Sequence, residues 1–351
     1  MITRRESIKL FLSNLLTMTI FAQSGRAANK KFIQNPGLSS VKNGFKGNEI
    51  IDDVFQNLYG QSGGSSLWQV LKWRFSENVQ KKIKDEENYS LPVTSAQTVL
   101  QDEDDYILWL GHASWLIQIN GKKIVTDPCL TSPPFVKRRT TLPIPIEAIK
   151  PDYLLISHGH YDHLDSDTLE HFGGATALIP LKMTKLIKNI NPGITCCEAG
   201  WYQQYNLAEN FQISLLPAHH WYRRSSHDYN KILWGSFLIK TQTTSIYFGG
   251  DSGYSDHFKE IGELFGGIDT AILPIAAYAP RWFMKASHIN PEEAMQAFKD
   301  LKAKRFIPMH YGTFDLSDEP LGEPEHRLKN ISSQETVTFL NIGEKYLGHL
   351  E

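Results

Sequence analysis

Cysteine is scarce in this sequence, and its three cysteines, Cys129, Cys196 and Cys197, cannot build a framework of disulfide bonds. An excess of charge of one sign is also absent, because 36 basic residues stand against 38 acidic ones. A chain with a formal net charge of −2 has no overall field that would attract nucleic acid. We therefore expect no nucleic-acid partner. Since hydrophobic residues make up 41% of the 351 residues, we expect a fold stabilised by its apolar core.

A membrane-spanning run is lacking at the N-terminus. The apolar stretch 10–22 is too short, and too interrupted by polar residues, to be a stable membrane span. It follows Arg4 and Arg5 and precedes a group of small residues, which is the pattern of a signal peptide of the twin-arginine type. We predict that residues 1–28 direct export, which makes the protein periplasmic or membrane-associated. The alternative is an amphipathic helix at the N-terminus of the mature protein.

Two regions that differ in composition and hydrophobic pattern follow. Residues 29–100 are polar and punctuated by glycine, and their one clear apolar segment, 67–73, has the spacing of a short amphipathic helix. We predict that this region is an extension packed on the core. Residues 101–351 contain short β-rich runs separated by turns and helical patterns, and we predict that they form the main domain.

The β-rich runs begin with an antiparallel meander and continue with strands that alternate with helices. This order indicates an α/β fold in which two packed sheets are covered by helices. One helix start is well marked, because Asn290 can cap it, Pro291 suits its first turn and Glu293 lies three residues beyond the cap. The predicted strands are 106–110, 115–119, 123–126, 153–157, 175–179, 211–216, 236–240, 245–248, 270–274 and 305–309.

Histidine carries the chemistry. Thirteen histidines are unevenly placed, and three of them fall inside residues 158–163, directly after a predicted strand. On an extended segment, His158 and His160 project the same way and can bind one ion, while the turn beyond brings Asp162 and His163 to a second. Imidazole and carboxylate ligands without thiolate favour zinc, or iron and manganese at similar geometry. An accidental cluster on a polar loop is the alternative.

Further ligand candidates lie alone, each at the end of a predicted strand: His219 or His220, Asp251, and His310. Taken singly, each is an ordinary capping or loop residue. Ligand sites in α/β folds lie beyond the carboxyl ends of the strands, however. Together, these residues can therefore supply the remaining ligands of a site for two metal ions.

The order His-x-His-x-Asp-His, then His, Asp and His, resembles the metallo-β-lactamase superfamily. The strings around these residues are similar to one branch, the N-acylphosphatidylethanolamine-hydrolysing phospholipases D. This resemblance implies that residues 101–351 form a catalytic domain with an αββα four-layer sandwich of two mixed β-sheets flanked by helices. The strings that carry it are LGHAS (110–114), TDP (126–128), HW (220–221), LWGS (233–236), GDSGY (250–254), AYAPRWFMK (277–285), HINPEEA (288–294) and HYGTF (310–314).

Carried over residue by residue, the resemblance implies a site for two zinc ions, with iron or manganese as the alternatives. Its ligands would be His158, His160 and His220 on one ion, Asp162, His163 and His310 on the other, and Asp251 bridging both. His220 is preferred to His219 because the pattern of the branch places the ligand directly before a tryptophan.

The resemblance also implies residues around the ligands. Asp127 and His112 would orient the ligands from behind, and His288 would lie beside the substrate phosphate as a catalytic residue together with Asp251. The branch often has glutamine where this chain has Ser287, so the phosphate environment differs there. Substrate contacts would come from Tyr278, Arg281, Trp282 and Ser287, and Lys285, Arg223 and Arg224 are further candidates for head-group phosphates.

The activity implied is hydrolysis of N-acylphosphatidylethanolamine to an N-acylethanolamine and phosphatidic acid through a metal-bridging hydroxide. The partners implied are a phospholipid substrate and a peripheral membrane contact, and the sequence does not determine the oligomeric state. The first alternative is a metal-dependent lactonase or another ester hydrolase of the same superfamily. Iron-dependent oxygen reduction and non-catalytic metal binding are disfavoured, the first because His160 stands where the iron type usually has glutamate and the second by the full ligand set.

Overall fold

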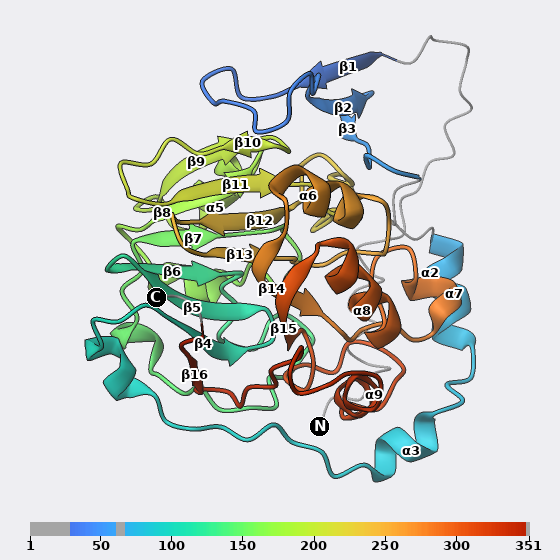
Figure 1. Ribbon diagram of the computed structural model, residues 1–351. Coiled ribbons are helices and arrows are strands. Elements are labelled where there is room, and N and C mark those ends of the chain that lie inside the picture. Colours follow the sequence, from blue (N-terminus) through green and yellow to red (C-terminus); the bar gives the residue numbers. More distant parts are fainter. Residues whose placement is uncertain (1–28, 61–66, 349–351) are drawn as a thin grey trace.

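The strands of this chain form two large mixed β-sheets with helices on their outer faces (Figure 1). The computed structural model describes residues 29–60 and 67–348, so the predicted signal peptide at residues 1–28 lies outside the described residues. The α/β fold of two packed, helix-covered sheets expected from the sequence is confirmed. Among the helices that the structure describes, none combines the length and the apolar character that crossing a membrane requires.

The first large sheet has the strand order β16-β4-β5-β6-β7-β8-β9. Neighbours from β16 to β6 are antiparallel, and neighbours from β6 to β9 are parallel. The carboxyl ends of β6 and β7 therefore lie at the same edge. The strands are β4 (Tyr106–Gly111), β5 (Ser114–Ile119), β6 (Lys122–Thr126), β7 (Tyr153–Leu155), β8 (Thr176–Pro180), β9 (Thr195–Ala199) and β16 (Lys345–Tyr346).

The second large sheet has the order β10-β11-β12-β13-β14-β15. Pairing is antiparallel from β10 to β13 and parallel from β13 to β15. As a result β11, β13, β14 and β15 all run in one direction and end at one edge. The strands are β10 (Gln203–Gln204), β11 (Gln212–Leu216), β12 (Ser236–Lys240), β13 (Ser245–Phe248), β14 (Ile268–Pro274) and β15 (Ala303–Met309).

Every strand predicted from the sequence is present. The structure adds β9, β10 and β16 to the large sheets, which the sequence did not predict.

Alternating side chains of the first sheet enter two separate apolar clusters. In β4, Ile107 and Trp109 face the second sheet and share a cluster with Phe237 of β12. Tyr106 and Leu108 face the other way and share a cluster with residues of the covering helices. Because both faces of the sheet are buried, its strands are apolar on both sides.

Helices cover the outer faces of the sheets. Helix α5 packs on β9 of the first sheet, and α8 packs on β14 and β15 of the second (Figure 1). The predicted start of α8 is confirmed as a capping box, in which Asn290 Oδ1 accepts the Glu293 N–H (2.9 Å) and Glu293 Oε2 accepts the Asn290 N–H (3.2 Å). The helices are α2 (Leu67–Phe75), α3 (Lys81–Glu86), α4 (Ser166–Glu170), α5 (Thr184–Ile190), α6 (His257–Phe265), α7 (Arg281–Met284), α8 (Pro291–Asp300) and α9 (Glu323–Ile331), with 3-10 turns at Gln97–Gln101 and Ile146–Ala148.

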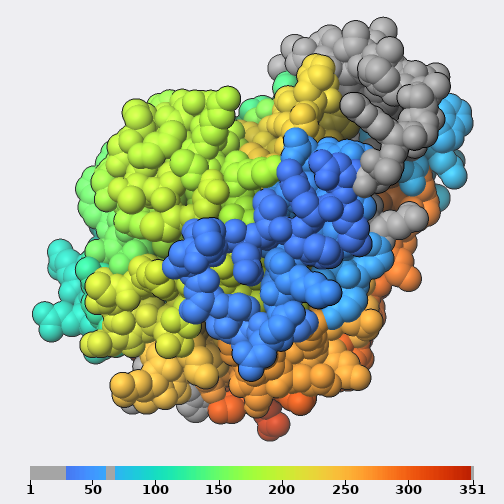
Figure 2. Space-filling model, turned by 90° about the horizontal axis from the view of Figure 1, so that it is seen from above, coloured from blue at the N-terminus to red at the C-terminus, as the bar shows by residue number. Residues whose placement is uncertain are grey.

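A small third sheet, absent from the predictions, lies in the N-terminal extension. It consists of β1 (Lys30–Ile33), β2 (Asn48–Ile51) and β3 (Val54–Phe55). Figure 2 shows this blue segment against yellow-green and gold parts of the main domain. The backbone N–H of Val41 donates to the carbonyl of Tyr202 (2.7 Å), and Lys42 forms an ion pair with Glu260 of α6. The described part of the extension, as far as β3, is thus joined to the main domain by specific contacts.

Candidate metal centre

The histidine-rich segment is the loop between β7 and α4. The strand ends at Leu155, earlier than predicted, so His158 and His160 do not lie on extended strand. Instead, the backbone N–H of His163 donates to the carbonyl of His160 (3.2 Å), which closes a turn. This turn lies beyond His158 and His160, and Asp162 and His163 stand within it, where the sequence predicted a turn.

The first group of ligand candidates is His158, His160 and His220. His160 Nδ1 lies 2.9 Å from His158 Nε2 and 3.1 Å from His220 Nε2. His220 follows β11 of the second sheet, whereas the other two follow β7 of the first. The group therefore joins the edges of both sheets, as expected for residues beyond the carboxyl ends of strands.

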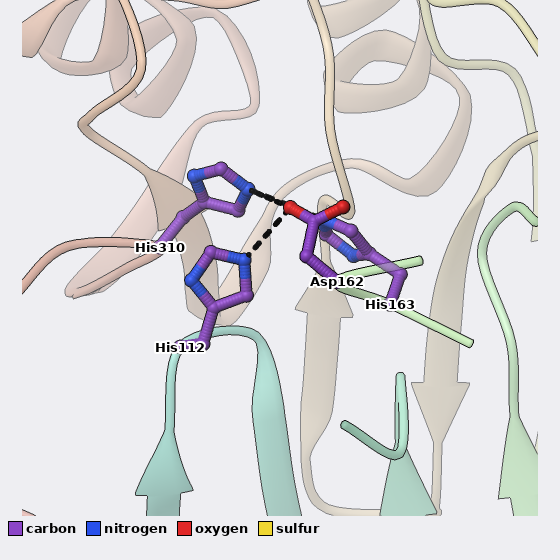
Figure 3. Close-up of side chains that lie close together, drawn as sticks. All are labelled: His112, Asp162, His163 and His310. Carbon is purple, nitrogen blue, oxygen red and sulfur yellow. Dashed lines mark hydrogen bonds and ion pairs between the residues drawn. The ribbon is translucent and has the colours of Figure 1, made fainter. Parts of the chain in front are cut away.

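The second group is His112, Asp162, His163 and His310, and Figure 3 shows their side chains converging. Asp162 Oδ2 lies 3.2 Å from His112 Nε2, 3.5 Å from His163 Nε2 and 3.6 Å from His310 Nε2. His112 was expected behind the ligands. In the structure it lies as close to Asp162 as the predicted ligands do, and its ring centroid is 3.9 Å from that of His310.

Asp251 lies between the two groups. Its Oδ1 is 3.0 Å from His310 Nε2, and its Oδ2 is 3.2 Å from His163 Nε2. The same Oδ2 is 3.9 Å from both His158 Nε2 and His220 Nε2. This carboxylate follows β13 and lies within reach of both clusters, which is the position that a bridging ligand needs.

The donor atoms fit divalent metal ions better than they fit a network of hydrogen bonds. His160 Nδ1 faces two imidazole nitrogens, yet a ring nitrogen carries at most one proton, so one hydrogen bond cannot satisfy both contacts. Nitrogen ligands of one zinc ion, each bound at about 2.0–2.1 Å in a tetrahedron, lie roughly 3.3 Å apart. The spacing between the imidazole nitrogens of this group approaches that value, so the three rings are already arranged as ligands of one ion.

The electrostatics of the two groups differ. Burial lowers the pKa of His160 to about 4 and holds the pKa values of His158 and His220 well below the ordinary value, so these rings are neutral, which is the form that binds metal. Burial also opposes charge on His310, but the carboxylates of Asp251 and Asp162 outweigh it and raise its pKa to about 9. At neutral pH the second group thus contains a protonated His310, and a divalent ion bound there would take the place of that proton.

Asp127, which the resemblance implied would orient the ligands, lies behind the ligand candidates. It follows β6, is fully buried, and its Oδ2 lies 2.6 Å from His163 Nδ1. It also accepts hydrogen bonds from the backbone N–H and the hydroxyl of Ser157 (2.6 Å each), and Ser157 Oγ lies 2.9 Å from His158 Nδ1. The Asp127 carboxylate therefore orients one histidine from each group, His163 directly and His158 through Ser157. The sequence analysis had not predicted this role for Ser157.

Of the residues expected to contact substrate, some lie at the centre and others are bound to protein groups elsewhere. His288 lies at the centre, with Nδ1 3.7 Å from Asp251 Oδ2, and the backbone carbonyl of Ser287 is 3.0 Å from His220 Nδ1. Trp282 is 46% exposed on α7. The Tyr278 hydroxyl, by contrast, donates to Glu323 (2.6 Å), and the Arg281 guanidinium binds Glu293 (2.7 and 2.9 Å) and the carbonyl of His288 (2.9 Å). The polar ends of Tyr278 and Arg281 are therefore occupied by protein groups.

Asn57 and Arg224 hold the centre in place through contacts that the sequence analysis did not predict. The Asn57 side chain donates to the backbone carbonyl of His220 (2.9 Å) and accepts from its N–H (3.2 Å), so the N-terminal extension holds a predicted ligand. Arg224, considered above as a head-group contact, instead donates to the carbonyls of Gly159 and Leu164 in the ligand loop (2.9 and 2.8 Å). Both partners are backbone groups, which leave no signal in a sequence.

Comparison with known proteins identifies relatives of this chain. A family model described as a β-lactamase superfamily domain matches residues 122–311. The Caenorhabditis elegans protein named N-acyl-phosphatidylethanolamine-hydrolyzing phospholipase D 1 is 34% identical over 302 residues, which cover 79% of this chain and 84% of that protein. The Saccharomyces cerevisiae protein of the same name, designated mitochondrial, is 38% identical over 244 residues, but the match spans only 52% of its length and 65% of this chain.

A shorter relative and a solved structure cover the main domain. A Pelotomaculum thermopropionicum protein named UPF0173 metal-dependent hydrolase is 31% identical over 248 residues, 68% of this chain and 97% of that protein. The structure of Igni18, described as a metallo hydrolase from the archaeon Ignicoccus hospitalis, matches with a TM-score of 0.53 and 24% identity over 69% of this chain and 97% of that chain. The structural likeness shows a shared fold.

Proposed function

This chain belongs to the metallo-β-lactamase superfamily and is a metal-dependent hydrolase, and on that premise we propose that it is a zinc-dependent phosphodiesterase of phospholipase D type. The reaction proposed is hydrolysis of N-acylphosphatidylethanolamine to an N-acylethanolamine and phosphatidic acid. The names of the C. elegans and S. cerevisiae relatives support this substrate. Zinc is proposed because the donors are imidazole and carboxylate without thiolate; iron and manganese accept the same donors.

The observation that carries the proposal is the place of Asp251 between two groups of ligand candidates. His158, His160 and His220 would hold one ion, and Asp162, His163 and His310 would hold the second. When bound, the two ions lower the pKa of a water molecule and offset the negative charge that develops on a phosphodiester in its transition state. A paired site of this kind suits attack at phosphorus, where both the attacking and the leaving oxygen need stabilisation.

His288 is the residue placed to act on the leaving group. Burial lowers its pKa to about 4, so the imidazole is neutral at neutral pH and offers one N–H and one acceptor nitrogen. Its Nδ1 has no hydrogen-bond partner among the described residues, although it is buried. We propose that His288 binds the phosphate or orders the water that protonates the leaving oxygen.

Solvent isotope labelling tests the reaction. The metal-loaded protein is given N-acylphosphatidylethanolamine in water enriched in oxygen-18, and both products are analysed by mass spectrometry. Attack of water at phosphorus places the label in phosphatidic acid and leaves the N-acylethanolamine unlabelled. Label in the N-acylethanolamine would mean cleavage of the carbon–oxygen bond and would contradict the mechanism.

Asp251→Asn is the matched inactive control, because a neutral amide cannot bridge two cations as a carboxylate does. This variant should keep the fold and lose turnover. A wild-type protein that turns over no phosphodiester but opens a sugar lactone rapidly would transfer the assignment to the lactonase alternative.

A further inference from the structure

Residues 29–57, which we call the N-terminal arm, end at a ligand candidate of the metal centre. The Asn57 amide pairs with the backbone of His220, donating to its carbonyl (2.9 Å) and accepting its N–H (3.2 Å). Asn57 Oδ1 also lies 3.2 Å from the indole nitrogen of Trp234, a fully buried residue. The family model matches residues 122–311. The contact between the arm and His220 therefore starts outside the part of the chain that the family model describes.

The docked arm leaves His220 fixed at three places. Asn57 binds both of its backbone polar groups, and its ring Nδ1 lies 3.0 Å from the backbone carbonyl of Ser287. Donation from Nδ1 to that carbonyl leaves the lone pair of Nε2 for an ion. Because His220 is fully buried, loss of the Asn57 amide would remove two hydrogen bonds at a buried position, where they are costly to replace.

A second contact of the arm acts on the residues that follow His220. The backbone N–H of Phe55, whose side chain is buried in the core, donates to the carbonyl of Asn230 (2.8 Å). Asn230 in turn pairs with Tyr222, accepting its N–H at Oδ1 and donating its own N–H to the Tyr222 carbonyl (2.9 Å each). The Tyr222 ring occupies the space where a Cβ atom of Gly159 would lie. The arm therefore supports the loop of His220 and, through Tyr222, the ligand loop after β7.

The second group of ligand candidates is supported by the main domain. Within residues 29–60 and 67–348, no hydrogen bond or ion pair joins the arm to Asp162, His163 or His310. Instead, Asp127 holds His163 (2.6 Å), and the backbone N–H of His310 donates to the carbonyl of His112 (3.1 Å). The arm is thus joined to the first group and has no direct bond to the second.

We propose that docking of the N-terminal arm is coupled to binding of the metal ion at the first group, with Asn57 as the positioning residue that couples them. An ion at this group needs His220 in the place that Asn57 fixes, so the docked arm raises the affinity for that ion. Coupling between two binding events is reciprocal, so the bound ion strengthens docking of the arm by the same factor. The ion of the second group binds independently of the arm. The inference rests on the ligand set of the proposed function and not on its substrate.

Titration of the full-length protein with zinc against a competing chelator tests the effect of the arm on the ion. Asn57→Ala should bind one ion about 10–100-fold more weakly than the wild type and the other ion equally well. Asn35→Ala is the matched control, because the Asn35 amide also joins the arm to the main domain, donating to the carbonyl of Glu198 in β9 (2.7 Å). This control should bind both ions as the wild type does. Equal affinities in the two variants overturn the proposal, and so does an equal loss of both ions in Asn57→Ala.

Hydrogen exchange of the wild type tests the effect of the ion on the arm and needs no variant. The backbone N–H of Phe55 reports docking, because its partner is the Asn230 carbonyl of the main domain. Adding zinc to the metal-free protein should slow exchange at Phe55 by the same factor of about 10–100. In Asn57→Ala, the same addition should slow it much less. A Phe55 exchange rate that does not respond to zinc in the wild type overturns the coupling.

The two proposals can fail separately, because neither measurement uses a substrate. Both effects in a protein that hydrolyses no phosphodiester would support the coupling and contradict the proposed function alone. Hydrolysis of N-acylphosphatidylethanolamine by a protein in which neither effect is seen would contradict the coupling alone.

Discussion

Arg224 holds the ligand loop from outside the ligand set. Its Nη1 donates to the carbonyls of both Gly159 and Leu164, which flank most of the predicted ligands of that loop. Its guanidinium carbon lies 3.9 Å from the ring centroid of Tyr161, and the Tyr161 hydroxyl donates back to the Arg224 carbonyl (3.1 Å). A single planar cation thus closes the loop and packs on its aromatic side chain, which lysine cannot reproduce.

We predict that Arg224→Gln weakens metal binding by about 10–100-fold, the usual cost of removing a group that supports metal ligands. Arg224→Lys should recover part of this loss at most. The measurement is a metal titration against a competing chelator. Arg223→Gln is the matched control. Arg223 is the neighbouring residue in the chain, and its guanidinium donates to the carbonyl of Ser225 (3.0 Å) and to no described part of the ligand loop. Equal metal affinities for the two glutamine variants would refute the role assigned to Arg224.

His257, a buried histidine outside the set of ligand candidates, makes the fold sensitive to acid. The ring is buried, with Nδ1 2.6 Å from Ser255 Oγ and Nε2 3.3 Å from Ser252 Oγ, and burial lowers its pKa to about 3. Between pH 6.5 and 3 the unfolded chain binds a proton here that the folded chain does not. The free energy of unfolding should therefore fall as the pH drops below about 6.5, by about 1.4 kcal/mol per pH unit.

Replacing this histidine should remove the effect. From pH 7 to pH 5, the free energy of unfolding should fall by about 2 kcal/mol less in His257→Gln than in the wild type. Urea unfolding at both pH values measures the difference, and the wild type serves as the control for acid effects at the metal centre. An identical loss in both proteins would show that His257 takes up its proton in the folded state.

At the scale of elements, α6 and α8 approach each other at Gly262. A Cβ atom there would lie 2.1 Å from the carbonyl oxygen of Asp300 and 2.9 Å from Cα of Leu301. Both are backbone atoms at the end of α8, so no side chain can rotate away. Since α8 packs on β14 and β15, the glycine lets both helices sit close on the second sheet.

Gly262→Ala should therefore destabilise the protein, by about 1–3 kcal/mol, although alanine is the better helix former. Thermal or urea unfolding measures the change. Gly173→Ala is the control, because a Cβ atom there would meet only the side chain of Asn191, at 3.6 Å. Unchanged stability in Gly262→Ala would mean that α6 can move away from α8 at little cost.

Local patterns in the sequence predicted the strands with apolar runs and the capped start of α8, because hydrophobic alternation and capping residues act over a few positions. They did not predict β9, whose sequence Thr-Cys-Cys-Glu-Ala has no apolar run and which is a strand because it pairs with β8. Likewise β7 ends at Leu155, two residues before the predicted end, and irregular backbone leads from there into the ligand loop. Strand pairing and loop closure depend on distant partners, which the sequence does not display.

The candidate site shows the same difference between features set by local sequence and features set by distant contacts. The ligand candidates could be found because their residue types and their places at strand ends are local facts. The supporting contacts could not, since Asn57 and Arg224 bind backbone atoms far away in the chain. Arg281 shows the converse, because a lone arginine suggests a phosphate partner while its carboxylate partner, Glu293, becomes visible only in three dimensions.

At the scale of the whole molecule, the candidate centre lies between the edges of the two large sheets. Loops after β6 and β7 supply residues from the first sheet, and loops after β11, β13 and β15 supply residues from the second. Bound ions would therefore link the sheets to each other. Binding to the folded chain alone adds to its stability.

We predict about two metal ions per chain, since a single zinc ion uses about four ligands and more candidates than that are present. Treatment with a chelator should lower the melting temperature by several degrees, and adding the metal back should restore it. Elemental analysis combined with calorimetry makes the measurement, and His163→Ala should lose one of the two ions. A melting temperature that does not respond to the chelator would contradict a link between the sheets.

Because the ligand candidates are distributed over both sheets, they are synthesised at different times, and this determines when the new chain can bind metal. His310 follows His158 by 152 residues. At ribosomal rates of about 5–20 residues per second, the ligand loop waits roughly 8–30 seconds before its last partner is synthesised. During this interval the nascent chain exposes several unpaired histidines, so any ion it captures early is held by an incomplete set. Correct loading is therefore a late event, which begins only when β15 has joined the second sheet.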